Sequence, residues 1–282
     1  MTRRPLSASL LALALTLPLG TGCIQYNNPC QPLVPDPEAV VGFLGQDVLL
    51  ERTYARHDNH AIGQLAADAL RHAEDRSKAP AELGVVNGGS LRSEGLCVNR
   101  TVLPKGPLES GVLHEVLLFE NPVVTVDLTE KQLVDMFEHA VETLTPAGQA
   151  ILSPPGAFLQ VSDGTTLSVD CERPAGSRVV ALQVNTRTVS LPARTDPSIR
   201  YRVAMVGYLL QGGDGYGAIF KDAATDLSRN PVTASAAEGK ATDANLTETY
   251  MRAHYRTESP GLREANRITF LHCARPARPV VQ

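Results

Sequence analysis

The chain has 282 residues, five cysteines and a formal net charge of −4 at pH 7. A mildly acidic chain without a run of basic residues is a poor candidate for nucleic-acid binding, so we expect no nucleic-acid partner. After the first two dozen residues, no apolar segment is long and uncharged enough to cross a membrane.

Residues 1–22 have the pattern of an export signal. Arg3 and Arg4 form its basic start, and the apolar stretch Leu6–Leu19 is too short to span a bilayer. Small residues directly before Cys23 are typical of a bacterial lipoprotein processing site, although Gly20 stands where leucine is usual. The alternative is an ordinary secretory signal. Both interpretations predict export to the periplasm or cell envelope. The lipoprotein interpretation adds an outer-membrane anchor, in which lipid on Cys23 is the only attachment to the membrane.

The other four cysteines predict two disulfides, because an even count in an oxidising compartment indicates paired thiols. Four cysteines allow three pairings, of which we favour Cys30 with Cys273 and Cys97 with Cys171. The sequence has no CxxC motif, so a zinc ribbon or a thioredoxin-like site has no support.

The chain divides into a leader, one domain and its extensions. Proline-rich residues 23–44 predict a tether or extended lead-in, and residues 45–225 predict a single mixed domain. Residues 226–273 are expected to form an extension packed on that domain, and residues 274–282 a loose tail.

The domain contains two clear helical patterns. His60–Glu74 places apolar side chains at helical spacing, and apolar residues of Asp127–Leu144 step by three and four onto one face. Thr129 is a candidate N-cap for the second helix. Strand-like segments, separated by Gly, Pro and Asn turns, lie at Leu83–Val86, Phe158–Val161, Thr165–Asp170, Arg178–Val184 and Thr188–Leu191. Helices and strands that do not alternate regularly favour an α+β fold.

The glycine-rich segment LLQGGDGYG, residues 209–217, matches none of the common phosphate loops. It lacks the Lys-Ser/Thr of a P-loop and the third glycine of a dinucleotide fingerprint, and it does not repeat as a calcium-binding β-roll would. The histidines of HDNH, residues 57–60, lack the neighbours that a metal motif needs, so we expect a solvated loop or a helix start there.

Longer segments, in a fixed order, carry more information than either motif. They are RTYARHDNHAIGQLAADAL (52–70), VVNGGSLRSEG (85–95), LLFENPVVTVDLTEKQLVDMFEHA (117–140), GAFLQVSDG (156–164) and YRVAMVGYLLQGGDGYG (201–217). Together they resemble the C-terminal, substrate-binding domain of secreted 5′-nucleotidases and UDP-sugar hydrolases. The resemblance implies a single mixed α/β domain with several strands and two or more long helices.

The resemblance also implies a nucleotide-binding site. By motif, Asp214 would contact the ribose hydroxyls from a loop whose glycines, Gly212 and Gly213 among them, would let the backbone come close. Phe158 and Tyr208 would sandwich the base. Stacking between two rings suits any base, because every base has a π-face. Tyr208 replaces the phenylalanine often found at this position, so its hydroxyl needs a partner or water.

The same resemblance places polar residues around the phosphate. Asn87 and Arg92 match by motif, and Arg56 and Arg52 are further candidates, although a solvated surface charge also explains Arg52. Guanidinium groups bind phosphate oxygens bidentately and stay charged at any working pH. The pair Gly88 and Gly89 would let the backbone approach a ligand closely.

Three positions depart from the usual family pattern. Asn59 stands where an acidic residue is usual, Leu118-Phe119-Glu120-Asn121 replaces PF-x-N, and Val161-Ser162-Asp163 replaces VSG. These departures leave the fold prediction in place. They change residues on which the substrate affinity and selectivity implied by the resemblance depend.

Full-length enzymes of this family join the domain to a metallophosphatase domain with two divalent metals, which carry the hydrolysis. The metal-binding motifs of that domain are absent from this sequence, so we expect no catalytic residue, metal site or cofactor in the chain itself. The sequence leaves three hypotheses open: a substrate-binding half that works with a separate metallophosphatase chain, a non-catalytic module for nucleotide capture or sensing, and a degenerate structural or interaction domain.

Overall fold

The computed structural model describes residues 33–73, 80–92, 101–151, 155–223 and 241–278. These residues belong to one structural unit. The predicted signal segment, the candidate lipidation site Cys23, and Cys30 and Cys97 lie outside the described residues. Within the described part, no helix has the length and apolar character that a membrane span requires.

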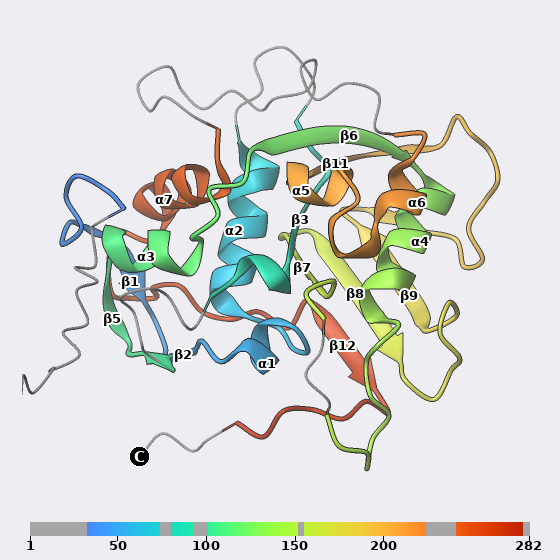
Figure 1. Cartoon of the computed structure of the whole chain (residues 1–282), viewed down its shortest axis with the longest axis horizontal. Coiled ribbons are helices and arrows are strands. Elements are labelled where there is room, and N and C mark those ends of the chain that lie inside the picture. Colours follow the sequence, from blue (N-terminus) through green and yellow to red (C-terminus); the bar gives the residue numbers. More distant parts are fainter. Residues whose placement is uncertain (1–32, 74–79, 93–100, 152–154, 224–240, 279–282) are drawn as a thin grey trace, which may run out of the picture. The chain divides into compact units, whose positions relative to one another are not determined.

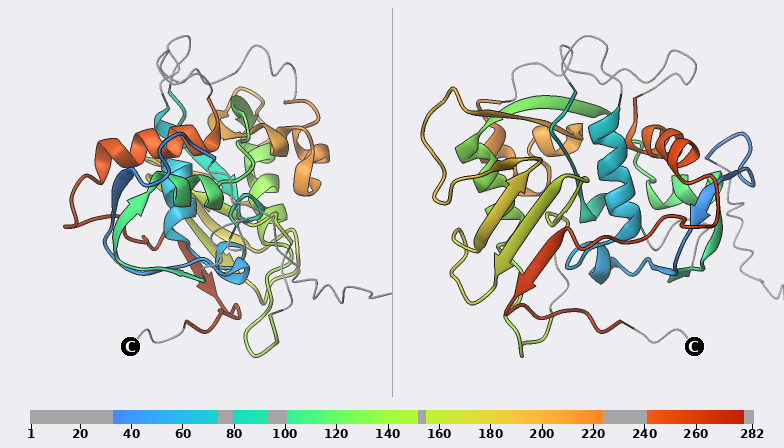
Figure 2. Two further views of the ribbon diagram at one scale, coloured as in Figure 1. Left: turned by 60° about the vertical axis from the view of Figure 1, so that its left-hand side comes forward. Right: turned by 180° about the vertical axis from the view of Figure 1, so that it is seen from behind.

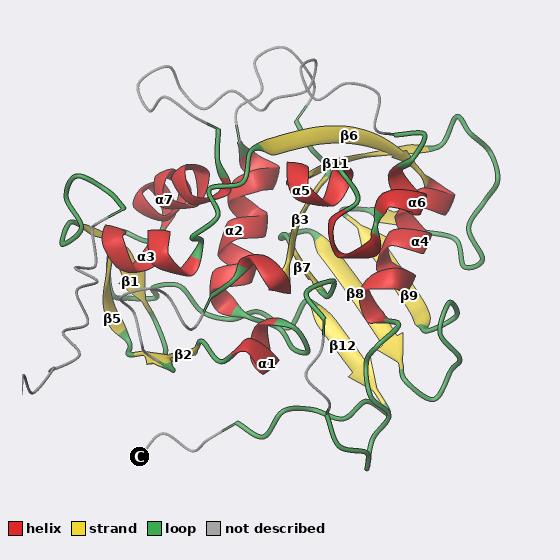
Figure 3. Cartoon of the chain, in the orientation of Figure 1, coloured by secondary structure: helices red, strands yellow, loops and turns green. Residues whose placement is uncertain are grey.

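Helices and strands are interleaved along the chain (Figure 3). The helices are α1 (Arg52–Ala55), α2 (Ala61–His72), α3 (Ser110–Val116), α4 (Glu130–Val141), α5 (Gly207–Leu210), α6 (Gly217–Phe220) and α7 (Asp243–His254), with 3-10 turns at η1 (Gly88–Ser90) and η2 (Gly213–Gly215). The strands are β1 (Val40–Leu44), β2 (Val48–Leu49), β3 (Leu83–Asn87), β4 (Val102–Leu103), β5 (Gly106–Glu109), β6 (Val123–Thr129), β7 (Leu159–Val161), β8 (Thr165–Asp170), β9 (Val179–Val184), β10 (Arg187–Thr188), β11 (Arg200–Val206) and β12 (Ile268–Leu271).

Two four-stranded sheets form the framework. The first has the order β6-β11-β3-β7, with β11 and β3 parallel and the other neighbours antiparallel. The second has the order β10-β9-β8-β12, with β8 and β12 parallel. Only Ser162–Gly164 separates β7 from β8, so one nearly continuous stretch of chain joins the two sheets (Figure 2).

Helix α2 lies at the centre of the molecule and is buried along most of its length. It packs on β3, β7 and β11 on one side and on α7 on the other (Figure 1). Every residue from Ala61 to Leu70 is buried, including the polar Gln64 and Asp68. Helix α4 packs against β6, β11 and β9, and Thr129 caps it in a capping box with Gln132, as the sequence predicts.

A disulfide joins Cys171 to Cys273, with a Cα–Cα distance of 5.0 Å. Cys171 directly follows β8, and Cys273 comes two residues after β12. Because these strands run parallel as neighbours, the residues beyond their ends lie side by side. The favoured pairing of Cys273 with Cys30 and of Cys171 with Cys97 is therefore wrong.

The α+β class is confirmed, and both long helices and four of the predicted strands are present with the same or slightly shifted ends. The strand predicted at Thr188–Leu191 is wrong beyond Thr188, where β10 ends. Residues 40–44, which the sequence assigns to the lead-in, form β1 and pair with β5. In the C-terminal part, α7 packs on α2, and β12 completes the second sheet beside β8.

Candidate functional site

One pocket brings most of the predicted site residues together. Its volume is 370 Å³, within the usual range for small-molecule sites. It is lined by Arg56, Asn87, Gly89, Ser90, Arg92, Phe119, Asn121, Gly156, Tyr208 and Asp214. Two larger surface hollows, of 790 and 640 Å³, are lined by neither phenylalanine nor tyrosine among the described residues.

The floor of the pocket is the end of strand β3. Asn87 is the last residue of this fully buried strand and is 1% exposed, so its position is fixed by the sheet. Ser90 Oγ donates a hydrogen bond to Asn87 Oδ1 at 2.6 Å. This contact orients the amide, and its Nδ2 donates to Asp214 Oδ2 at 2.7 Å.

Asp214 lies in the glycine-rich loop after β11 and α5. Its φ of 51° falls in the left-handed region, which aspartate tolerates better than most residues. The ring Nε2 of His139, on α4, contacts the Asp214 carbonyl oxygen at 2.8 Å. Since the carbonyl only accepts, this nitrogen carries the proton and holds the loop backbone.

Two glycines make room for the Asp214 carboxylate. A Cβ at Gly156 would lie 2.6 Å from Asp214 Oδ2, and one at Gly89 would lie 3.0 Å from it. The sequence predicts that Gly89 admits a ligand, but in the structure it admits the side chain that we expect to contact the ligand. Gly88 has a related role, because a Cβ there would collide with the Ala55 carbonyl of α1.

The exposed aromatic rings of the pocket are Phe119 and Tyr208, which are 49% and 44% exposed. The Arg92 guanidinium lies over the Phe119 ring, 4.3 Å from its centroid, and also donates to the Gly89 carbonyl at 2.6 Å. The hydroxyl of Tyr208 lies 3.2 Å from Asp214 Oδ1. The predicted need of this hydroxyl for a partner is thus met by Asp214.

Phe158, predicted to stack on the base, lies in the core instead. It is 3% exposed, it stacks on Phe270 at a centroid distance of 6.2 Å, and it does not line the pocket. Phe119 lines the pocket, whereas Phe158 does not. The sequence signal for it was the LFEN match to the family motif PF-x-N, which also contains the pocket residue Asn121.

Positive charge gathers at one side of the pocket. Arg56 and Arg92 line it, and burial together with the like charges of Arg52 and Arg92 lowers the pKa of Arg56. Arg52 itself is exposed at the start of α1 and does not line the pocket. An arginine stays charged despite such a shift, so this side favours an anion.

Gly212 and Gly213 also lie outside the pocket lining. Gly212 has a φ of 97°, which suits glycine, and the Tyr208 ring lies directly against Gly213 where a Cβ would point. These glycines therefore shape the loop and seat the tyrosine ring.

A family model of the 5′-nucleotidase, C-terminal domain, matches residues 40–222. The chain belongs to the 5′-nucleotidase C-terminal domain family. It is 30% identical over 176 residues to the apyrase of Tabanus yao, a match that covers 60% of the chain and 29% of that protein. It is 32% identical over 164 residues to the 5′-nucleotidase of Bos taurus, covering 55% of the chain and 26% of the relative. The chain thus spans less than a third of these relatives.

Solved structures agree with this assignment. The 5′-nucleotidase precursor from Thermus thermophilus superposes with a TM-score of 0.62 at 27% identity, over 83% of this chain and 40% of that one. The NAD nucleotidase of Haemophilus influenzae gives a TM-score of 0.59 at 16% identity and supports the fold alone.

The C-terminal segment, residues 241–278, lies beyond the residues that match the 5′-nucleotidase C-terminal domain model, yet it contacts the pocket. Asn121 Nδ2 donates to Asp243 Oδ2 at 3.0 Å, and the Asp243 amide donates to the Asn121 carbonyl at 2.9 Å. Asp243 begins α7 and is fully buried, and desolvation raises its pKa to about 6. The start of α7 is therefore bound to the pocket wall.

A buried polar junction, formed by residues 57–60 with the C-terminal segment, fixes the chain next to Arg56. His57, Asp58, Asn59 and His60 are each no more than 3% exposed, so the predicted solvated loop is wrong. The alternative prediction of a helix start is right, since the His60 ring accepts the Gly63 amide and caps α2. Burial lowers the pKa of both histidines to about 4.

The side chains of this junction bind the C-terminal segment. Asp58 pairs with Arg275 and with Arg278, the latter at 3.1 Å. Asn59 donates from Nδ2 to the Ile268 carbonyl at 2.9 Å and accepts the Ile268 amide at 3.1 Å, as a neighbouring strand would. Asn59 is one of the departures from the family pattern, and this contact gives it a structural role.

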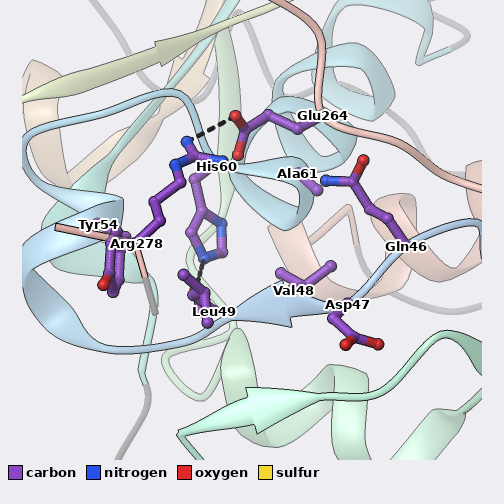
Figure 4. A pocket seen from close by; sticks show the side chains of 9 residues that line it. All are labelled: Gln46, Asp47, Val48, Leu49, Tyr54, His60, Ala61, Glu264 and Arg278. Carbon is purple, nitrogen blue, oxygen red and sulfur yellow. Dashed lines mark hydrogen bonds and ion pairs between the residues drawn. The ribbon is translucent and has the colours of Figure 1, made fainter. Parts of the chain in front are cut away.

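A hollow of 170 Å³ adjoins the junction, next to β2 and the start of α2 (Figure 4). Two of its polar side chains are paired within the chain: His60 Nε2 with the Leu49 carbonyl at 2.8 Å, and Arg278 with Glu264 at 2.7 Å. This hollow fastens segments together and does not present convergent groups to a ligand.

The donor set of the 370 Å³ pocket does not fit the two divalent metals of a metallophosphatase. Among the described residues, its lining offers one carboxylate, Asp214, no histidine, and two guanidinium groups that repel a cation. Asp170, Glu172 and His272 form the one described His/Asp/Glu cluster with ligand spacing, and they are not pocket residues. The pocket lining thus combines guanidinium groups and aromatic rings with a single carboxylate.

Proposed function

We propose that the chain binds a nucleotide or nucleoside phosphate in the 370 Å³ pocket. The base stacks on Phe119 and Tyr208, the sugar hydroxyls donate to Asp214, and the phosphate lies near Arg56 and Arg92. The observation that carries this proposal is the convergence, in one pocket, of two half-exposed rings, one carboxylate and two guanidinium groups.

Each group suits a different part of such a ligand. Two half-exposed rings in one pocket offer surfaces for a base, and base–aromatic stacking contributes about 1–3 kcal/mol per base. A carboxylate accepts hydrogen bonds from a sugar diol, and guanidinium forks bind phosphate oxygens bidentately. Family membership supports the same ligand class, since the relatives include 5′-nucleotidases and an apyrase.

In cellular terms, the chain acts in nucleotide catabolism as the substrate-binding half of a phosphate-ester hydrolase, with a metallophosphatase on a separate chain supplying the metals. The misfit of the pocket with metals supports a source of metals outside this pocket. The protein is exported, which the Cys171–Cys273 disulfide and the leader sequence favour, and it is anchored through Cys23. Non-catalytic nucleotide capture is the alternative role for the same pocket.

Calorimetry with AMP tests the binding. We expect AMP to bind the wild-type chain, and Phe119→Ala to weaken binding about tenfold, corresponding to the loss of one stacking partner. Leu271→Ala is the matched control, because it removes an exposed apolar side chain outside the pocket. An absence of AMP binding at millimolar concentration would leave only a degenerate structural or interaction domain.

Hydrolysis assays separate the catalytic roles. The purified chain with AMP and Mn²⁺ is expected to release no phosphate, whereas release with a partner metallophosphatase should depend on Asp214. Phosphate release by the chain alone would show that it has a catalytic centre of its own, which would contradict the proposed division of roles.

A further inference from the structure

The loop that carries Asp214 is held at its backbone by one histidine of helix α4. His139 lies in the last turn of that helix, and its Nε2 lies 2.8 Å from the Asp214 carbonyl oxygen. The loop fits closely around the ring, since Tyr216 meets it edge-on at a centroid distance of 4.6 Å and a Cβ at Gly215 would lie 2.9 Å from Nε2. Because the carbonyl and the carboxylate belong to the same residue, the contact that fixes the carbonyl also places the carboxylate.

The other ring nitrogen of His139 faces an acceptor as well. Nδ1 lies 3.2 Å from Glu142 Oε1, three residues further along the chain. A carbonyl and an ionised carboxylate only accept hydrogen bonds, so the two contacts together need a proton on each ring nitrogen. A neutral ring has one proton. When Glu142 takes that proton on Nδ1, the lone pair of Nε2 faces the Asp214 carbonyl and the loop loses its bond.

Solvent reaches this ring from a different side of the molecule than the ligand pocket. His139 and Glu142 line the 790 Å³ hollow and not the 370 Å³ pocket, and the histidine side chain is 19% exposed. The remaining charged side chains of that hollow have partners of their own: Lys131 with Asp135, Arg173 with Asp170, and Glu138 with the amides of residues 178 and 179.

Two further titratable groups face the ring from the loop. Burial raises the pKa of the Tyr216 hydroxyl well above its usual value, so this group stays neutral. The Asp214 carboxylate is bonded to Asn87 at 2.7 Å, inside the pocket. Among the described residues, Glu142 is therefore the carboxylate that competes with the Asp214 carbonyl for the ring proton.

Resting on the proposed nucleotide site, we propose that His139 is a positioning residue for Asp214 and links nucleotide binding to its own protonation through Glu142. The doubly protonated ring bonds to both acceptors and holds the loop. Loss of one proton sets the two acceptors in competition, so Asp214 is held less firmly and the nucleotide binds more weakly. Histidine is the side chain that ordinarily changes charge between pH 5 and 8, so this contact favours binding at pH 6 over pH 8.

Calorimetry with AMP at pH 6 and pH 8 tests this inference through the ratio of the two affinities. In Glu142→Gln, the amide donates to Nδ1 and leaves the ring proton on Nε2. In His139→Gln, an amide that does not titrate replaces the ring. We expect the ratio of the pH 6 affinity to the pH 8 affinity to be about fivefold smaller in each variant than in the wild type, as for one hydrogen bond.

Two groups outside this contact also titrate in the same range, namely the phosphate of AMP and the buried Asp243, but both are common to all the proteins compared. His72→Gln is the matched control, because His72 also contacts a carboxylate, Asp163 at 3.0 Å, and lines neither the hollow nor the pocket. It should keep the wild-type ratio. A ¹⁵N NMR spectrum of the free wild-type protein needs no ligand, and at pH 6 it should show a proton on both ring nitrogens of His139.

The possible outcomes distinguish this inference from the proposed function. AMP binding with equal ratios in the wild type, Glu142→Gln and His139→Gln overturns the role of His139 and leaves the nucleotide site standing. A single ring proton on His139 at pH 6 overturns that role too, as does a ratio in His72→Gln that falls as far as in Glu142→Gln. Failure of AMP to bind the wild type at either pH overturns the proposed function and this inference together.

Discussion

The 370 Å³ pocket, which Arg56 lines, and the buried polar junction, which begins at the next residue, use similar side chains in opposite ways. In the pocket, the aromatic rings are about half exposed and Asp214 holds Tyr208 by long hydrogen bonds. In the junction, Asp58 and Asn59 are almost fully buried and are bonded to a segment some two hundred residues away in sequence. Half-exposed side chains with weakly held partners are typical of a binding site. Buried side chains with fixed partners are typical of a contact that holds two segments of chain together.

The strongest test of this contrast concerns a buried ion pair that holds the C-terminal segment. Arg267 binds Asp68 through two contacts of 2.6 and 2.8 Å, and Asp68 is 4% exposed. Arg267→Met leaves this carboxylate buried without its cation, so we expect a loss of about 3–5 kcal/mol in the free energy of unfolding. Urea denaturation measures it.

Lys131→Met is the control for the ion pair, because Lys131 and Asp135 are exposed and their contact should be worth less than about 1 kcal/mol. The loss in Arg267→Met should shrink at low pH, where Asp68 becomes protonated. Equal losses in both variants would show that burial does not separate the two kinds of pair.

Two phenylalanines provide the next test. Phe158→Ala removes a core ring and should lower the free energy of unfolding by about 3–5 kcal/mol. Phe119→Ala removes a half-exposed ring and should change stability by no more than about 0.5 kcal/mol, while AMP binding weakens about tenfold. Thermal unfolding and AMP calorimetry on the same samples measure both effects. A large stability loss in Phe119→Ala, together with weakened AMP binding in a stable Phe158→Ala, would show that the core and pocket roles of the two rings are reversed.

The third test is a pH dependence from the junction. His57 and His60 have pKa values of about 4 in the folded chain, lowered by burial from 6.5. Between pH 6.5 and 4 the unfolded chain binds protons that the folded chain does not. Stability therefore falls on acidification, by roughly 1.4 kcal/mol per pH unit for each histidine within that window.

His57→Leu should remove one of these contributions and flatten the decline, as urea denaturation at pH 7, 6 and 5 would measure. Asp243 has the opposite effect on the pH dependence of stability, because burial raises its pKa from 3.8 to about 6. It is present in both the wild type and His57→Leu, so it does not affect their comparison. His254→Leu, at an exposed position, should keep the wild-type slope. If His57→Leu keeps the wild-type slope of stability against pH, His57 does not contribute to the loss of stability on acidification.

Local patterns predicted the elements well. Apolar spacing located α2 and α4, and the sequence marked Thr129 as a cap because serine and threonine N-caps act on residues only three positions away. Most of the pocket followed from motif order, including Asn87, Arg92 and Asp214. These features depend on short stretches of chain, whose physics the sequence displays directly.

Long-range contacts were beyond the same approach. The pairing of Cys171 with Cys273 depends on β12 joining the second sheet beside β8, which no local pattern indicates. Phe158 and Phe119 are both phenylalanines, and the burial of Phe158 depends on core contacts with distant segments, such as the ring of Phe270. Likewise, Asp58 looks solvent-exposed until Arg275 and Arg278 are placed beside it.

The strand β12 has a practical consequence for anyone who trims this protein. The family match ends at residue 222, a natural place to cut when preparing the domain alone. Such a cut would discard the edge strand of the second sheet and one half of the disulfide, and would strip Asp68 of its cation. The smallest unit that keeps every one of these contacts extends through Cys273, so family limits and folding limits differ here by more than fifty residues.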